Sequence, residues 1–221
     1  MELYHIHVLG KHDNLFKNKE IIINKDTYNN EVYERVYNNS FKVDTRKYPN
    51  TVEAINYFNC LSGFQNLGLN ENISLIISGV LNNGTLEEKL QALRDASEIL
   101  HNAAMMKREL SMEEYRRDNE PNKPSRLHSF YACDSVGLSY WVEQLRGNKA
   151  ADVYVIDSID EPFKTNEQLM PLENTNFIES YYASKNYFNP KEKDLTGKTN
   201  EYLIQGKVKI LEKVFEIGSN K

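Results

Sequence analysis

The stretch TNEYLIQGKVKI, residues 199–210, has an apolar run on one side of Gly206 and alternating lysine and apolar residues on the other. This arrangement predicts a pair of β-strands that meet at the glycine. Glu201 lies at the mouth of the first strand, which we expect to be half-buried. A carboxylate in this position is either a functional anion or a charge that protects a sheet edge from aggregation.

The rest of the chain contains segments that favour strands and segments that favour helices. Runs of strand-forming residues predict strands at 3–8, at the start of 20–37, and within 127–135 and 152–159. Apolar residues recur at helical spacing in 85–110, 136–145 and 174–188. The sequence therefore predicts a single α+β domain that spans residues 1–221.

A block of helices, about residues 50–120, is expected as an insertion between the β-rich ends of this domain. One of its helices begins at Thr85, which stands three residues before Glu88 in a capping box. Its apolar stripe is formed by Leu86, Leu90, Leu93 and Leu100. Ser111 and Glu114 form a second capping box, so we expect another helix to begin there.

Composition limits the classes of function. The chain has 32 acidic and 27 basic residues, so no overall attraction to nucleic acid or to an anionic membrane is expected. There is no long apolar run, and residues 1–10 are typical of a strand, so we expect a cytoplasmic protein without a membrane partner. Cys60 and Cys133 lack metal-ligand spacing, and we expect both to be buried thiols.

His5 and His7 are the first polar residues to which chemistry can be assigned. They lie two apart on a predicted strand, so their side chains point to the same face, as a metal site requires. No further histidine or acidic cluster has matching spacing. We therefore predict no metal site here, and we favour the alternative in which one imidazole is hydrogen-bonded in the core and the other is incidental.

The charged segment around residue 113 is a second candidate. Glu109, Glu113 and Glu114 could act in general acid–base catalysis. Glu113 and Arg117 stand four apart, however, which favours an ordinary pair on a solvated helix face. Arg126 stands where an irregular segment becomes a strand, and from there a guanidinium could grip a phosphate or a carboxylate.

Aromatic residues gather between the middle strand and the helix that follows it. They are Phe130, Tyr131, Tyr140 and Trp141, and they form either plain core or a stacking pocket. Neither the glycine fingerprint of dinucleotide-binding folds nor the phosphate-binding P-loop motif is present in the sequence.

Three short motifs stand in a fixed order along the chain: Tyr4–His5, SFYACDSVGLSYW at 129–141, and NEYLI at 200–204. In this order they resemble the motifs of ADP-ribosyltransferases of the diphtheria-toxin and poly(ADP-ribose) polymerase type. There a first-strand His, a middle Tyr and a late-strand Glu form the NAD site. The polymerases carry a near-identical Asn-Glu-Tyr-Ile around their catalytic Glu.

The chain is also similar to a family of uncharacterised bacterial proteins that is thought to share the transferase fold. That family begins with Tyr-His and has a segment of the form RE…E…R…PSR. The matching residues here are Arg108, Glu109, Glu113 or Glu114, Arg117 and Pro124-Ser125-Arg126. Together the matches cover the two ends and the middle of the chain, about a third of it.

The resemblance implies a split β-sheet core and a mono-ADP-ribosyltransferase. Such an enzyme cleaves the nicotinamide–ribose bond of NAD and transfers ADP-ribose to an acceptor, here an unidentified protein or nucleic acid. Glu201 would be the catalytic residue, because a carboxylate stabilises the positive charge that builds on the ribose. Tyr131 and Tyr140 would stack on nicotinamide, His5 would hold the adenosine-side ribose, and Arg126 would meet the diphosphate.

One motif departs from the family pattern. The polymerases have His-Gly-Ser where this chain has His5-Ile6-His7, so the hydroxyl that binds the nicotinamide amide is missing. We expect the backbone of Ile6 to make that clamp instead. The middle motif leaves Phe130 or Tyr131 for its first aromatic position and Tyr140 or Trp141 for its second; we favour Tyr131 and Tyr140.

The resemblance leaves the biological role open. The alternatives to transfer are NAD glycohydrolysis in the same site, and an inactive module of the same fold that holds a nucleotide or a partner. A bacterial or phage protein that acts as a toxin or in phage conflict would suit the resemblance, and such a protein can have an inhibitory partner protein.

Overall fold

The computed structural model describes residues 2–10, 12–26, 28–30, 32–33, 82, 84–146 and 149–218. The chain divides into two compact units: Met1–Tyr33 together with Arg108–Lys221, and Glu34–Lys107. The second unit is therefore inserted into the sequence of the first. The helices expected between residues 50 and 81, and Cys60, lie outside the described residues.

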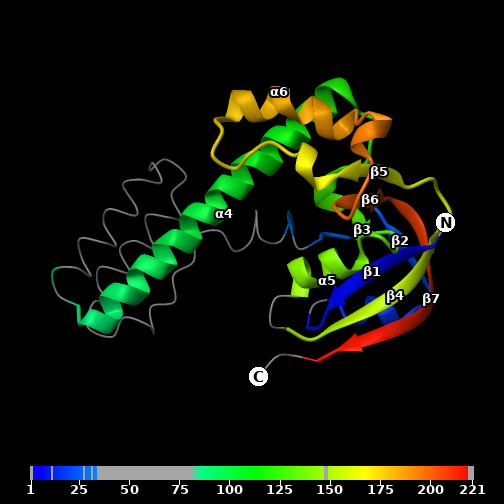
Figure 1. Ribbon diagram of the computed structural model, residues 1–221, viewed down its shortest axis with the longest axis horizontal. Helices are drawn as coiled ribbons and strands as arrows, with labels where there is room; N and C mark the ends of the chain where they lie inside the picture. The colour runs from blue at the N-terminus through cyan, green and yellow to red at the C-terminus, as the bar shows by residue number, and fades with distance from the viewer. Residues whose placement is uncertain are drawn as a thin grey trace. The chain divides into compact units, whose positions relative to one another are not determined.

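The strands of the first unit form two antiparallel sheets (Figure 1). Their bounds are β1 Leu3–Val8, β2 Glu20–Ile23, β3 Phe130–Ala132, β4 Ala151–Ser158, β5 Phe163–Asn166, β6 Asn200–Ile204 and β7 Gly206–Ile217. One sheet has the order β1-β4-β7-β2, and the other has the order β3-β6-β5. The helices α4 Leu86–Asn119, α5 Leu138–Arg146 and α6 Phe177–Phe188 complete an α+β fold, as the sequence predicted.

The two sheets are joined both by backbone hydrogen bonds and by the chain itself. Tyr4 of β1 and Cys133, directly after β3, exchange backbone hydrogen bonds of 2.8 and 2.9 Å. The chain also passes from β6 in one sheet to β7 in the other through Gln205 alone. Gly206 makes this sharp corner with φ of +98°, which side chains other than glycine rarely tolerate. The predicted strand pair about Gly206 is confirmed.

The core explains why the second half of β6 is apolar. Tyr202 and Ile204 of β6 pack with residues of both sheets, among them Leu3 and Ile23. Leu203 lies between them in sequence and points to the opposite face of β6, where it packs against Met112 of α4 and Tyr187 of α6. Both faces of β6 are covered and both edges are paired, so the strand is fully buried, and the expectation of a half-buried strand was wrong.

Helix α4 differs from the sequence prediction at its middle. The first capping box is confirmed, since the backbone N–H groups of Thr85 and Glu88 donate to each other's side chains at 2.8 and 3.3 Å. The second was wrong: Ser111 lies inside the helix, and its hydroxyl donates to the Arg108 carbonyl at 2.8 Å. The stripe residues are largely exposed: Leu86, Leu90, Leu93 and Leu100.

Helices α5 and α6 were predicted correctly, and their N-terminal residues explain where they lie. Asn176 and Glu179 form a reciprocal capping box at the start of α6. Just before α5, a side chain at Gly137 would meet the Lys198 carbonyl oxygen at 2.9 Å. This close approach lets Trp141 donate from Nε1 to the Asn200 carbonyl at 2.8 Å, which fixes α5 beside the start of β6.

The buried-thiol prediction is confirmed for Cys133, which is 2% exposed. Burial is the main cause that raises the pKa of its thiol to about 12, so the thiolate does not form at physiological pH. Within the described ranges, no helix combines the length and the apolar character needed to cross a membrane.

We predict that Gly206→Ala destabilises the protein by about 1–3 kcal/mol, because the added methyl group strains a positive φ and overlaps the Asp160 carboxylate. Urea denaturation measures the change. Gly218→Ala is the control, since Gly218 has open space around its Cα and should change stability by less than about 0.5 kcal/mol. Equal stabilities for the two variants would contradict the assigned role of the corner.

Candidate functional site

The site is built around a buried arginine. Arg126 begins a short 3-10 helix, η3 Arg126–His128, in which the Leu127 N–H donates to the capping Ser125 hydroxyl. Its side chain is only 7% exposed. Nε donates to Glu109 Oε2 of α4 at 2.9 Å, and Nη1 donates to Glu201 Oε1 of β6 at 2.6 Å. One guanidinium thus joins a helix, a 3-10 turn and a central strand.

Tyr187 of α6 completes the contacts of Glu201. Its hydroxyl donates to Glu201 Oε1 at 2.6 Å and accepts a short hydrogen bond from Arg126 Nη1. The two hydrogen bonds to Glu201 therefore fall on the same oxygen, Oε1, and Oε2 carries neither of them. The aromatic rings of Tyr131 and Tyr187 lie 5.3 and 4.9 Å from the guanidinium carbon of Arg126, within cation–π range.

Charges alternate along the chain of contacts. Arg108 lies 3.4 Å from Glu109, Glu109 bonds Arg126, and Arg126 bonds Glu201. Burial alone would lower the pKa of Arg126, but the two carboxylates outweigh it and hold that pKa well above its ordinary value. Burial, reinforced by Glu201, raises the pKa of Tyr187 well above its ordinary range, so its phenol stays a donor.

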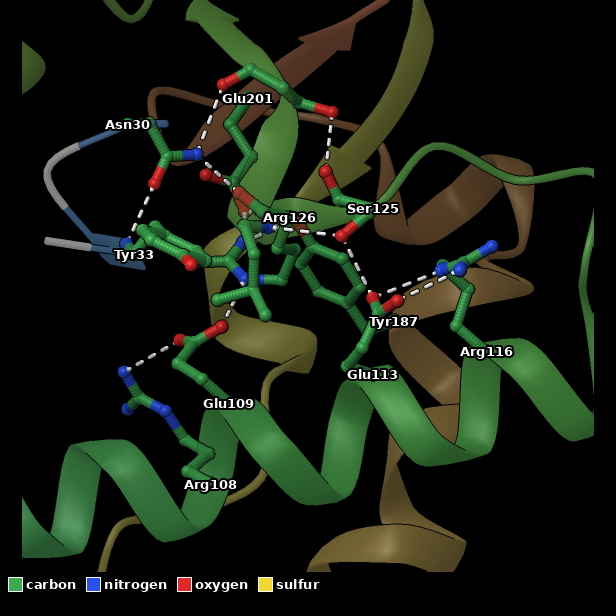
Figure 2. A network of polar contacts seen from close by, with 12 residues as sticks. Asn30, Tyr33, Arg108, Glu109, Glu113, Arg116, Ser125, Arg126, Tyr187 and Glu201 are labelled. Carbon is green, nitrogen blue, oxygen red and sulfur yellow. Dashed lines mark hydrogen bonds and ion pairs between the residues drawn. The ribbon is translucent and has the colours of Figure 1, made fainter. Parts of the chain in front are cut away.

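A second polar group on α4 adjoins the first (Figure 2). Glu113 is 7% exposed and accepts from Arg116 at 2.8 and 3.0 Å and from Ser125 at 2.8 Å. Burial would raise the pKa of Glu113, but its hydrogen bond with Arg116 and the charge of Arg116 lower it on balance. The predicted pair with Arg117 exists, at 3.1 Å, and Glu114 is exposed as a solvated face requires, but the expectation was wrong for Glu109 and Glu113, which point inward.

The conformation of the loop at Arg126 is fixed by side chains from two other parts of the chain. The Tyr131 hydroxyl donates to the Arg126 carbonyl at 2.9 Å, and the Asn30 amide also donates to that carbonyl through a short hydrogen bond. Asn30 donates to the Ser129 carbonyl as well, at 3.0 Å. Asn30 was not predicted from the sequence, because an isolated asparagine carries no spacing signal.

His5 is fixed in one protonation state. Its Nδ1 lies 2.7 Å from the Tyr131 carbonyl oxygen, which can only accept, so Nδ1 carries the proton. The ring stacks on Phe130 with centroids 3.9 Å apart. Burial lowers the pKa of His5 to about 3, so the imidazole is neutral at physiological pH and Nε2 is left as an acceptor.

The backbone of Ile6 faces a defined edge of β1. Tyr4 bonds Cys133 on the β3 side, and successive residues of a strand direct their N–H and C=O groups to alternate sides. His5 therefore turns its backbone toward β4, with which it pairs at Tyr154, whereas Ile6 turns its N–H and C=O to the β3 side. Ile6 therefore presents one backbone donor and one backbone acceptor along this edge of β1.

Tyr140 lies half-buried at the start of α5 and has a different set of partners. Its hydroxyl donates to Glu167 Oε2 at 2.6 Å, and Lys198 Nζ lies 5.3 Å from the ring centroid. The bond to Glu167 is the main cause that raises the pKa of Tyr140 to about 12. Glu201 contributes to the same shift, so its charge acts on the Tyr140 phenol.

The sequence-predicted residues therefore fall into two groups. The Arg126 guanidinium bonds Glu201, the Arg126 carbonyl accepts from the Tyr131 hydroxyl, and the Tyr131 carbonyl bonds His5, whose ring stacks on Phe130. Tyr140 is joined to Glu167 instead. Sequence reasoning missed Glu167 and Tyr187, and it did not pair Arg126 with Glu201; the one available signal was the RE…PSR pattern, which contains Glu109 and Arg126.

Two alternatives raised by the sequence can now be judged. Glu201 does not protect a sheet edge, because β6 is the central strand of its sheet. His5 and His7 do lie on one face, with ring centroids 6.5 Å apart, but His7 Nε2 bonds Asp13 at 2.7 Å and His5 bonds a carbonyl. Among the residues that the structure describes, no group of three or more His, Cys, Asp or Glu side chains could hold a metal ion.

Fold and site define an α+β protein with two antiparallel sheets and a buried Arg–Glu–Tyr cluster at the central strand of the smaller sheet. The chain belongs to the family described as Protein of unknown function (DUF2441), which it matches over residues 3–216. A search of curated proteins finds no significant match.

We predict that Arg126→Met destabilises the protein by about 3–5 kcal/mol, because it leaves Glu109 and Glu201 buried without the shared guanidinium. Arg117→Met is the matched control: the Arg117 side chain is 69% exposed, and its pair with Glu113 should be worth less than about 1 kcal/mol. Chemical denaturation compares the two. Similar losses of stability in the two variants would contradict the prediction that the buried ion pair stabilises the protein more than the exposed one.

We also predict a pH dependence from His5. Its folded pKa, about 3, lies below the ordinary 6.5, so as pH falls the unfolded chain takes up the proton first and stability is lost between those values. The loss should reach about 2 kcal/mol between pH 7 and pH 5. In His5→Asn, which keeps an N–H donor for the Tyr131 carbonyl, urea denaturation across this range should give a flatter curve. Parallel curves would contradict the assignment.

Proposed function

We propose that this protein is a mono-ADP-ribosyltransferase that uses NAD as its substrate. One observation carries the proposal: Tyr131 and Glu201, from the middle and last motifs, both contact Arg126, and His5 of the first motif bonds the Tyr131 backbone carbonyl. These residues are far apart in sequence, and the transferase resemblance requires all of them in one site.

The state of each group suits the reaction. Cleavage of the nicotinamide–ribose bond builds positive charge on the sugar, and a fixed carboxylate stabilises it. Arg126 and Tyr187 hold Glu201 through Oε1, which leaves Oε2 to accept a hydrogen bond from a ribose hydroxyl. His5 offers the acceptor Nε2 to the second ribose, and Ile6 offers a backbone donor and acceptor to the carboxamide.

The structure changes the role that we propose for Arg126. The sequence suggested that it binds the diphosphate, but its Nε and one of its Nη atoms are bonded to protein carboxylates. We therefore propose that Arg126 orients Glu201. The NAD substrate implies action in the cytoplasm, where NAD is available. The acceptor is a protein or a nucleic acid, and an inhibitory partner protein would restrain such an activity until it is needed.

A module of the same fold that binds NAD without turning it over is a second candidate. The observation that favours it is the burial of Glu201, which is 4% exposed and already hydrogen-bonded by two protein donors. Such a module would bind NAD saturably and release no nicotinamide. An NAD glycohydrolase would release nicotinamide without labelling any macromolecule.

Nicotinamide release from NAD by the wild type and by Glu201→Gln tests the proposal. We predict release by the wild type in the presence of a bacterial lysate as a source of acceptors, and a loss of at least about 100-fold in the variant. Glu212→Gln, an exposed carboxylate of β7, is the control and should match the wild type.

Labelled NAD in the same experiment distinguishes the alternatives. Label on a protein or nucleic acid supports transfer, and nicotinamide release without label supports hydrolysis. A shift in melting temperature without release supports the binding module. If Glu201→Gln cleaves NAD as fast as the wild type, the transferase assignment is wrong.

A further inference from the structure

The proposed reaction needs a base that Glu201 is poorly placed to supply. When a hydroxyl of the acceptor attacks the ribose, its proton must leave, and a second carboxylate usually accepts it in inverting glycosyl transfer. Glu201 is buried and is hydrogen-bonded by Arg126 and Tyr187 at 2.6 Å each. These bonds stabilise it as an anion for the sugar, so a different group is needed for the acceptor.

Glu167 directly follows β5, the strand that pairs with β6 beside Glu201. Thr165 of β5 stands directly opposite Glu201 of β6. The ladder continues past the end of β5, because the Glu167 backbone N–H donates to the Thr199 carbonyl at 3.0 Å. Glu167, the first residue of the 3-10 helix η4 Glu167–Leu169, therefore lies two residues beyond Thr165, the cross-strand partner of Glu201. Carboxyl groups in inverting glycosyl-transfer sites are separated by about 6.5–9.5 Å, so two neighbouring carboxylates that do not touch suit the reaction.

The side chain of Glu167 is linked to the predicted nicotinamide pocket. Its Oε2 accepts from the Tyr140 hydroxyl at 2.6 Å, and the Tyr140 phenol also experiences the charge of Glu201. Unlike Glu201, Glu167 is half-exposed, so an acceptor from solution can reach it. The bond from Tyr140 uses one carboxylate oxygen and orients the group.

We infer that Glu167 is the general base that removes the proton from the acceptor during ADP-ribosyl transfer. This inference rests on the proposed function. In the step, the C1′–N bond of NAD breaks and its electron pair goes to nicotinamide, which leaves as a neutral molecule. The acceptor oxygen forms the new C1′–O bond, and its proton passes to the Glu167 carboxylate. The anomeric centre is inverted, because the attack comes from the face opposite nicotinamide.

The test uses azide, an anionic nucleophile that has no proton to lose. With water as the acceptor, Glu167→Gln should release nicotinamide at least about 100-fold more slowly than the wild type. Sodium azide should restore release by this variant to within several-fold of the wild-type rate, with formation of ADP-ribosyl azide. Azide should not restore Glu201→Gln, because Glu201 stabilises the sugar cation rather than the nucleophile.

Glu161→Gln is the matched control, since Glu161 is an exposed carboxylate just before β5 and should behave as the wild type does. If the wild type releases nicotinamide and Glu167→Gln does so equally fast, the inference about Glu167 is overturned while the transferase proposal stands. A slow Glu167→Gln that azide fails to restore also overturns it. If the wild type releases no nicotinamide in water, in azide or with lysate, the proposed function itself fails, and the inference fails with it.

Discussion

The shared guanidinium of Arg126 is the interaction on which the site depends. It binds Glu109 and Glu201 from two elements that are distant in sequence, at 2.9 and 2.6 Å, in a place where none of the three side chains is more than 7% exposed. Removing one member of such a cluster leaves an uncompensated buried charge, which is costly. Helix α4, the η3 turn and strand β6 must therefore be positioned together, and the position of Glu201 follows from that requirement.

Glu201 and a second carboxylate, Glu167, differ in their surroundings. Glu201 is held by donors on one oxygen, which suits a fixed anion that stabilises developing charge. Glu167 is half-exposed, and its carboxylate accepts a hydrogen bond from the Tyr140 hydroxyl. These surroundings suit the proposed role of a base that accepts a proton from a molecule in solution. Two carboxylates in different surroundings can take different roles in one reaction.

Local structure was largely predictable. The strands on either side of Gly206 and the helix that begins after Asn176 follow from short-range patterns, and both are confirmed. The errors arose where a local rule met tertiary packing. Ser111 and Glu114 match a capping box, yet α4 continues through them, because one face of the helix is buried against α6 and β6. That burial also turned Glu109 and Glu113 inward, although their spacing is typical of a solvated face.

The sequence by itself determined the α+β class, the order of the three motifs and the choice of Glu201 as the residue to explain. Only the tertiary structure decided what Glu201 touches. Arg126 is 75 positions away and Glu109 is 17 positions from Arg126, so no helical or strand periodicity relates them. Ion pairs over such separations depend on how the sheets and helices pack. The burial of β6 on both faces brings these residues together. Because Glu201 is buried there, its charge must be balanced by a neighbouring group, and Arg126 is that group.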